Sequence, residues 1–315
     1  MSHTMDSLDQ IIYNDTLQTT KPVTEPFEYL LKQQGKRVRT LLIEEFGKLY
    51  EVPKPSIDAV SAFIDELHTA SLLIDDIEDN AELRRGHVAA HKKYGIWTTL
   101  NSAQCAVYVS ISKLLAKEHE PSLPSIINDE LIRLHVGQGQ DIYWRDDGIV
   151  PSVNEYYEMA KNKTGGLFRL MVRLLHALSK KELAQKYDLI PLANAAGILY
   201  QIRDDYLNLF SKTMFEQKGF ADDLTEGKFS FPIIHAIASS RNEGDNDDYV
   251  LKTVLSRPSE IRTKEKLLSY LEHQTKSGEY TRQVIQTLAQ KVTTELVPKE
   301  LSSVKDILSK LSQLD

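Results

Sequence analysis

The sequence predicts an all-α protein, and three observations support this. Hydrophobic residues recur at steps of three and four over long stretches, which is the period of an amphipathic helix. Alternation of the kind found in strands is nowhere sustained. Glycine and proline number only 14 and 11 in 315 residues, which disfavours a turn-rich β architecture. With 41% hydrophobic and 26% charged residues, the chain can bury a substantial core, and we expect ten or more helices.

Short stretches rich in turn-forming residues separate the expected helices. A first helical segment opens at Gly35-Lys36-Arg37-Val38-Arg39. Breaks are then predicted at 52–55, 118–124, 146–152, 211–219 and 239–248. All are loop-sized and none resembles a long linker between domains. The expected organisation is therefore a polar N-terminal segment, 1–24, followed by one domain, 25–315.

Two of the expected helices lead into acidic clusters. Hydrophobic residues at helical spacing over 60–74 run directly into the first cluster, and the same pattern over 192–209 surrounds the second. In each cluster an oxygen-bearing side chain follows the first Asp by four positions, and residues so spaced share one face of a helix. The clusters are Asp75-Asp76-Ile77-Glu78-Asp79 and Asp204-Asp205-Tyr206-Leu207-Asn208.

Carboxylates gathered in a hydrophobic setting repel one another and need a counter-charge. Hard oxygen ligands in this arrangement suit Mg²⁺ that also holds a substrate phosphate. A solvated helix end is the alternative, because the chain has five Asp-Asp pairs. The pairs at 146–147, 222–223 and 247–248 lack a hydrophobic helical approach. Two matched clusters that have one favour a metal site.

Basic residues supply the complementary half of a phosphate site. Diphosphate carries several negative charges, which Arg forks and Lys ammonium groups would neutralise together with the metal. Each cation alone is better explained as a surface charge, and His68, about two turns before Asp75, is explained equally by a place in the core. The candidates are Lys36 and Arg39, Arg84-Arg85, Lys163-Thr164 beside two glycines, and Lys228.

Composition excludes several other classes. A net charge of −7 without a basic stripe argues against nucleic acid as a partner. Cys105 is the single cysteine, so an intramolecular disulfide and a thiolate zinc cluster are excluded and a reducing compartment is expected. The first 25 residues are polar and contain acids, unlike a signal or transit peptide. No hydrophobic run is long enough for a transmembrane segment, and we expect a cytoplasmic protein.

Taken together, the motifs resemble those of trans-prenyl diphosphate synthases, closest to the eukaryotic, fungal-type geranylgeranyl diphosphate synthase branch. The resemblance covers about 25 to 236 and continues more loosely to the end. It implies a bundle of α-helices around a deep central cavity, assembled as a homodimer or a multiple of dimers. The segments that carry it are 73–80, 83–86, 137–146 (Gly-Gln-Gly-Gln-Asp-Ile-Tyr-Trp-Arg-Asp), 163–168, 201–206 and 226–232.

The resemblance also implies an activity. Isopentenyl diphosphate would condense with an allylic diphosphate, farnesyl diphosphate above all, through ionisation, condensation and proton elimination with two to three Mg²⁺ ions. The implied metal ligands are Asp75, Asp76, Asp79, Asp204 and Asp205, which count as catalytic together with Lys163 and Lys228. The implied allylic diphosphate contacts are Arg84, Lys163, Thr164, Gln201, Lys218 and Lys228. The implied isopentenyl diphosphate contacts are Lys36, Arg39, His68 and Arg85.

The sequence departs from the family pattern at several positions. Gln34 stands where the family has proline before Gly-Lys, and Asn208 ends the second cluster in place of Asp, which should weaken metal binding. Small residues one turn before Asp75 argue against a product that stops at C15, and valine in the expected cavity floor leaves room. We therefore expect a C20 product with some C25. The residues expected to set product length are Ala70, Ser71, Val107, Tyr108 and His135.

Two other functions share these features. A class I terpene cyclase also uses an aspartate-rich helix, but its second metal motif needs Ser or Thr and then Glu at four-residue steps, where this chain has Asn208 and Lys212. A noncatalytic synthase subunit would be a regulatory partner, yet such subunits usually lose their acidic clusters. A purely structural helical protein leaves the matched clusters unexplained.

Overall fold

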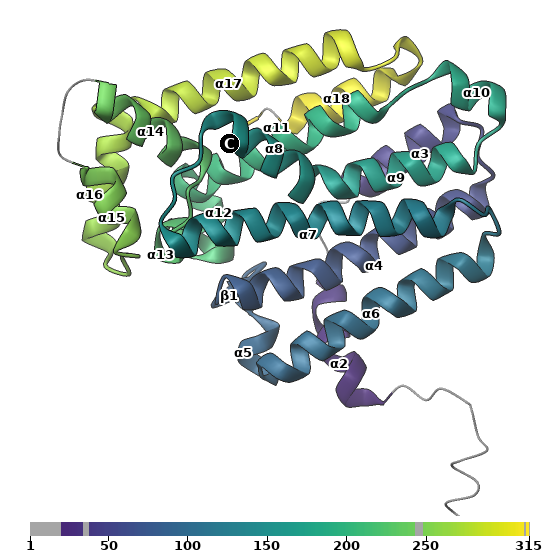
Figure 1. The fold of residues 1–315 in the computed structure, drawn as a ribbon, viewed down its shortest axis with the longest axis horizontal. Helices are drawn as coiled ribbons and strands as arrows, with labels where there is room; N and C mark the ends of the chain where they lie inside the picture. Colours follow the sequence, from purple (N-terminus) through teal and green to yellow (C-terminus); the bar gives the residue numbers. More distant parts are fainter. Residues whose placement is uncertain (1–19, 34–37, 243–247, 312, 315) are drawn as a thin grey trace, which may run out of the picture.

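The computed structural model describes residues 20–33, 38–242, 248–311 and 313–314. Nearly all of them are helical, which confirms the all-α prediction (Figure 1). The α-helices are α2 (Lys21–Leu31), α3 (Val38–Leu49), α4 (Lys54–Glu78), α5 (Ala90–Tyr94), α6 (Ile96–Lys117), α7 (Leu123–Asp147), α8 (Val153–Lys163), α9 (Gly165–Ala177), α10 (Lys181–Lys186), α11 (Ile190–Phe210), α12 (Lys212–Lys218), α13 (Asp222–Glu226), α14 (Phe231–Asn242), α15 (Tyr249–Leu255), α16 (Ile261–His273), α17 (Ser277–Lys291) and α18 (Ser302–Leu311). A π-helical turn, η1 (Val292–Leu296), and a 3₁₀ turn, η2 (Lys299–Leu301), precede α18.

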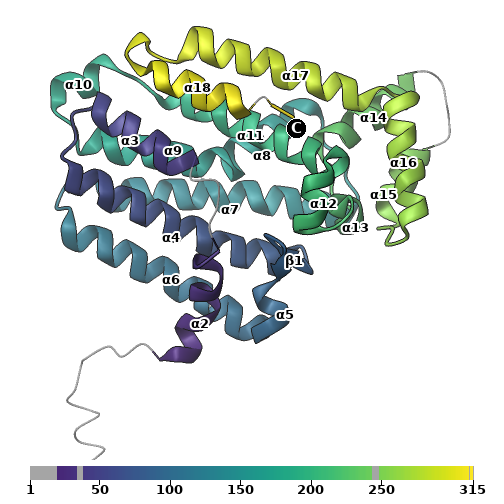
Figure 2. The same ribbon diagram turned by 180° about the vertical axis from the view of Figure 1, so that it is seen from behind.

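The long helices run side by side and give the molecule its shape. Figures 1 and 2 show α6, α4 and α7 next to one another, with α17 and α18 along one edge and α14, α15 and α16 at one end. α4 packs on α6, α7 packs on α8 and α9, and α11 packs on α9 and α17. This arrangement brings the ends of α4 and α11, which carry the two acidic clusters, toward the same part of the bundle.

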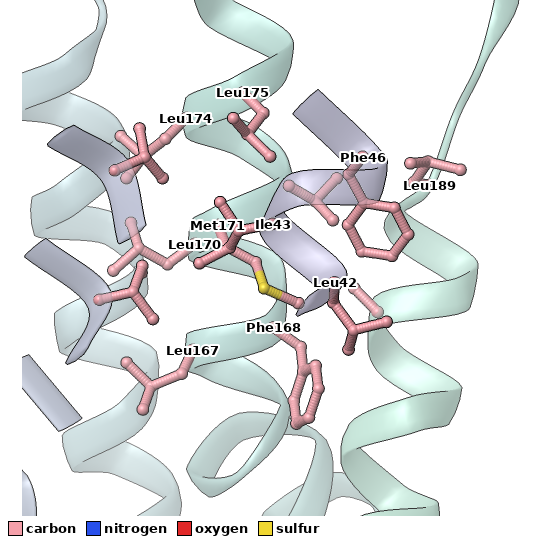
Figure 3. Close-up of a cluster of buried hydrophobic side chains, with 14 of the residues drawn as sticks. Leu42, Ile43, Phe46, Leu167, Phe168, Leu170, Met171, Leu174, Leu175 and Leu189 are labelled. Carbon is pink, nitrogen blue, oxygen red and sulfur yellow. The ribbon is translucent and has the colours of Figure 1, made fainter. Parts of the chain in front are cut away.

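The larger hydrophobic core lies at the other end of these helices. Leu42, Ile43 and Phe46 of α3 pack against the 167–175 stretch of α9, as Figure 3 shows. Burying one such side chain contributes about 1.5–3 kcal/mol, so this cluster anchors α3, α4 and α9 to one another. Phe168, at the start of α9, also faces the central cavity. The core therefore fixes one wall of the functional site.

A small hairpin follows α4. Strands β1 (Leu83–Arg84) and β2 (His87–Val88) are antiparallel with Leu83 opposite Val88, and they are the only strands in the described residues. Gly86 at the turn has a φ of 77°, a conformation that glycine adopts without strain. Its amide donates to the carbonyl of Gln217 in α12 at 3.0 Å. The hairpin is thereby tied to α12 and holds its two arginines next to the end of α4.

The predicted breaks can be compared with the helix ends. Those at 52–55, 118–124 and 146–152 are confirmed, and Ser152 begins α8 with a capping box formed with Glu155. The break predicted at 211–219 was wrong in part: it contains α12, whose first turn is capped by the Ser211 hydroxyl. At 239–248, α14 continues to Asn242, and 243–247 lie outside the described residues.

The first described helix, α2, begins at Lys21, four residues before the expected domain boundary. The division at residue 25 remains a prediction. Among the helices of the described ranges, none combines the length and the hydrophobicity that crossing a membrane requires.

Candidate active site

A cavity of ≈ 800 Å³ lies between α4, α7, α9 and α11, with α12 and α13 at its polar end. Its wall contains most of the residues singled out in the sequence. From the acidic clusters it includes Asp75, Asp79 and Asp204. From the other predicted positions it includes Arg39, His68, Ser71, Arg84, Arg85, His135, Lys163, Thr164, Gln201, Lys218 and Lys228. Lys36 falls outside the described residues.

Asp75 is the centre of the first cluster. Arg84 donates to its Oδ2 at 3.2 Å, Gln138 donates to Oδ1 at 3.3 Å, and the Lys163 ammonium lies 3.8 Å from Oδ1. Burial would raise the pKa of Asp75, but the positive charges of Lys163 and Arg84 outweigh it and hold the pKa below its usual range. Asp75 is therefore an ionised carboxylate facing the cavity.

Asp76 has a different role. Its side chain is 1% exposed, and Arg84 Nε donates to its Oδ1 at 2.6 Å. Asp76 is not on the cavity wall, unlike its neighbour, because adjacent positions on a helix point about 100° apart. Its contribution in this structure is to hold Arg84, which spans both aspartates.

The second cluster divides in the same way. Asp204 faces the cavity, and the Lys218 ammonium lies 3.8 Å from its Oδ2. Asp205 is fully buried and does not line the cavity. It accepts from Tyr156 at 2.6 Å, from the Phe231 amide at 2.8 Å, from Gln201 at 2.9 Å and from Lys228 at 3.1 Å. These four donors satisfy the Asp205 carboxylate, which in turn holds the Lys228 ammonium and the Phe231 amide in place.

Two lysines lie next to the acidic clusters. Lys163, at the end of α8, donates to Asp141 at 2.7 Å, and the pKa of this ammonium is raised because Asp141 and Asp75 outweigh its burial. Burial would lower the pKa of Lys228 as well, but the negative charges of Asp205 and Asp223 outweigh burial and raise this pKa. Both side chains therefore stay protonated at neutral pH in the mostly buried wall, where they can pair with phosphate oxygens.

A separate basic group lies on the α3 and hairpin side of the cavity. Arg39 lies over the ring of Tyr200, 5.9 Å from its centroid, and Arg85 donates to the carbonyl of Gln33. Burial and the charges of Arg39 and Arg85 lower the pKa of His68 well below its usual value, so the ring is neutral. Two arginines and a neutral imidazole suit the recognition of a second anionic group.

The expected length-determining residues are only partly on the wall. Ser71 and His135 line the cavity. Ala70 is fully buried off the wall. Val107 packs against the hydrophobic core, and Tyr108 is 68% exposed. The placement of α6 on the far side of α4 explains this, because α6 packs on α4 and not on the cavity. Val107 and Tyr108 therefore do not form a cavity floor within this chain.

Several residues of the site were missed by sequence reasoning. Gln138 of α7 donates to Glu78 at 2.7 Å as well as to Asp75, and both line the cavity. Asp223 and Glu226 also line it, although their segment was interpreted as lacking a helical approach. The spacing of Asp223 and Glu226 in a short helix, α13, was the available signal. Asn208 supports that helix by accepting from the Asp223 amide at 3.0 Å.

Several carboxylates lie close together at the polar end. Burial and the charge of Asp75 raise the pKa of Asp79 to about 6, and burial raises that of Asp223 to about 7, against the pull of Lys228. No three metal-binding side chains converge on one point within the described part of the chain. Oxygen donors that do not complete a shell by themselves suit Mg²⁺, which commonly takes one or two carboxylates together with substrate phosphates and water. The residues present therefore fit such an ion.

Comparison with known proteins gives a consistent result. The family described as polyprenyl synthetase matches residues 20–271. A geranylgeranyl pyrophosphate synthase of Eremothecium gossypii is 40% identical over 98% of this chain and 99% of its own length. Geranylgeranyl pyrophosphate synthase olcC of Penicillium canescens is 42% identical over 93% of this chain and 86% of its own. A protein named IDS-like terpene synthase 1, from Melampsora lini, is 42% identical over 91% and 88%.

Proposed function

This chain belongs to the polyprenyl synthetase family, and we propose that it is a Mg²⁺-dependent geranylgeranyl diphosphate synthase. It would condense isopentenyl diphosphate with an allylic diphosphate, with farnesyl diphosphate as the main primer. The observation that carries the proposal is a single cavity with a charged end and a hydrophobic end. Leu72, Leu134, Leu167 and Phe168 line the latter.

The charged end would bind the allylic diphosphate. Bound Mg²⁺ would neutralise the diphosphate and favour its departure. We narrow the proposed metal ligands to Asp75, Asp79 and Asp204, because these carboxylates reach the wall and Asp76 and Asp205 do not. Lys163 and Lys228 would pair with phosphate oxygens. Lys218, Arg84 and the hydrogen-bonded pair Thr164–Gln201 would complete the cradle.

The reaction itself needs positioning more than covalent participation by the protein. The allylic C–O bond breaks and the diphosphate leaves with the electron pair. The C3=C4 double bond of isopentenyl diphosphate forms the new C–C bond to the allylic carbon and leaves a cation at C3. Transfer of a proton from C2 to the departed diphosphate then forms the C2=C3 double bond. The second diphosphate, that of isopentenyl diphosphate, would be held by Arg39, Arg85 and neutral His68. This would turn the double bond of the same substrate toward the allylic carbon. The hydrophobic wall would keep water away from the cation, which water would otherwise capture.

We propose that the molecule acts as a homodimer or a multiple of dimers. Hydrophobic side chains that are half or more exposed lie along the outer faces of α6 and α7. They are Trp97, Tyr108, Ile132, Val136 and Tyr143. A second copy covering them would remove an unfavourable exposed surface. Sedimentation velocity of Tyr143→Glu tests this assignment: the substitution should shift the wild-type dimer toward monomer, and an unchanged dimer would place the interface elsewhere.

With one cysteine in the chain, we propose that the protein works in the cytoplasm, a reducing compartment.

Product analysis tests the function directly. Purified protein is incubated with Mg²⁺, isopentenyl diphosphate and each allylic primer, and the products are dephosphorylated and separated. A C20 alcohol is the expected result, and inertness would indicate a noncatalytic subunit. A hydrocarbon would indicate a terpene synthase, as one relative's name suggests. Asn208 argues against that outcome, because its Oδ1 already accepts from the Asp223 amide in the first turn of α13.

A further inference from the structure

We propose that Arg145 is a positioning residue: it fixes the carboxylate of Asp79 and thereby sets the affinity of the cavity for a metal–diphosphate pair. This role rests on the proposed function for the identity of that ligand. Arg145 lies in the last turn of α7 and is not part of the cavity wall. It therefore acts through Asp79, without touching the substrate.

Asp79 needs an anchor because of its place in α4. It is the C-cap residue, with φ of −91° and ψ of −4°. The last carbonyls of a helix carry a partial negative charge, so a carboxylate at this end is electrostatically unfavourable, and helix ends fray. Asp75, one turn earlier, is instead held within the helix and by Arg84 and Gln138. Asp79 depends more on a contact from another element.

Arg145 supplies that contact. Its Nη1 donates to Asp79 Oδ1 at 2.8 Å, and the two side chains are 10% and 17% exposed. A partly buried, charge-assisted bond from a planar guanidinium restricts the direction of the carboxylate. Only one oxygen is used, which leaves Oδ2 for a ligand in the cavity. Arg145 can thus orient Asp79 and still allow it to bind a metal.

Arg145 is itself fixed by a second ion pair. Its Nε donates to Asp146 Oδ1 at 3.0 Å, and Arg257 donates to the same oxygen at 2.8 Å. Arg257 also lies against Gly227, where a Cβ would be 3.0 Å from its side chain, and Gly227 directly precedes the cavity residue Lys228. Two ion pairs and this side-chain contact therefore connect the end of α4 to the segment that carries Lys228.

Calorimetric titration of Mg²⁺ with inorganic diphosphate tests the role. Arg145→Gln should weaken binding about 10- to 100-fold, the usual effect of removing a group that orients a metal ligand. Arg145→Lys should recover part of the affinity. Arg133→Gln, at an exposed position of the same helix, is the matched control and should bind as wild type does.

A double-mutant cycle separates positioning from a general structural effect. If Arg145 acts through Asp79, Arg145→Gln should have little further effect on binding in an Asp79→Asn background. Full additivity, unchanged affinity or tighter affinity in folded Arg145→Gln would overturn the proposal, and tighter affinity would show that the guanidinium competes with the metal. If Arg145→Gln fails to fold, Arg145→Lys decides. A lysine cannot reproduce the separate guanidinium contacts to Asp79 and Asp146, so full affinity in this variant would also overturn the proposal. These titrations do not depend on turnover, so absence of C20 product in wild type would refute the proposed function separately.

Discussion

Substitution of Ser71 by phenylalanine should shorten the product. Ser71 lies on the cavity wall one turn before Asp75, and its hydroxyl donates only to the His68 carbonyl of the same helix. The introduced ring would project along the path of the growing chain. Because the benzyl group is slightly larger than one isoprene unit, it should occupy the space that the fourth unit uses.

The magnitude follows from the burial of that unit. One further C5 unit buries four to five carbons, which is favourable by about 3–4 kcal/mol in a dry cavity. Forcing it against the ring would lose this gain and add about 1–3 kcal/mol of overpacking. The swing of about 4–7 kcal/mol corresponds to at least a ~10³-fold change in favour of C15 over C20.

Chromatography of the dephosphorylated products measures this change, and Ala70→Phe is the control. Ala70 was also expected to set product length, but it is fully buried and does not line the cavity, so its substitution should not shorten the product. Ala70→Phe should overpack the helix interface and lower the melting temperature without shifting the product. A folded Ser71→Phe variant that still makes mainly C20 would refute the reasoning, as would equal shortening by Ala70→Phe.

Four further outcomes are expected. Arg39→Gln should raise the KM for isopentenyl diphosphate about 10- to 100-fold with little change for the allylic primer; the reverse pattern in steady-state kinetics would contradict the assignment. Lys163→Met should chiefly impair allylic binding or ionisation, and a burst experiment with farnesyl diphosphate showing normal ionisation would speak against it. Glu130→Ala removes the partner of buried Arg169 and should cost about 3–5 kcal/mol in urea unfolding, whereas a cost below ~1 kcal/mol would mean that the pair contributes little. Because burial holds the pKa of His68 well below its usual value, its ring should stay neutral into the acidic range, and an NMR titration midpoint at or above the ordinary histidine value would contradict this.

Local periodicity was sufficient to predict the helices that carry the site. The hydrophobic residues of 60–74 and 192–209 define one buried face each, and α4 and α11 form as expected. The stretch 211–219 was misjudged because Ser211 was read as a loop residue, although serine also caps helices. Element type was thus predictable wherever a long apolar face decides it.

Contacts between distant segments were not predictable in the same way. Spacing identifies Asp75 and Asp76 equally, yet only the packing of Arg84 shows that one faces the cavity and the other is buried. Val107 was expected in the cavity floor, but the side of α6 that packs on α4 depends on tertiary structure. Arg145 lies in a segment that carries the family resemblance, but no role could be assigned to it, because its partner Asp79 lies 66 positions earlier in the chain.

The most direct test is a crystal structure with Mn²⁺ and an unreactive thio analogue of farnesyl diphosphate. Anomalous scattering should place the metal ions beside Asp75, Asp79 and Asp204, with the diphosphate bridging them and the farnesyl chain passing Ser71. Metal ions bound by Asp76 or Asp205, or a diphosphate outside this cavity, would contradict the account.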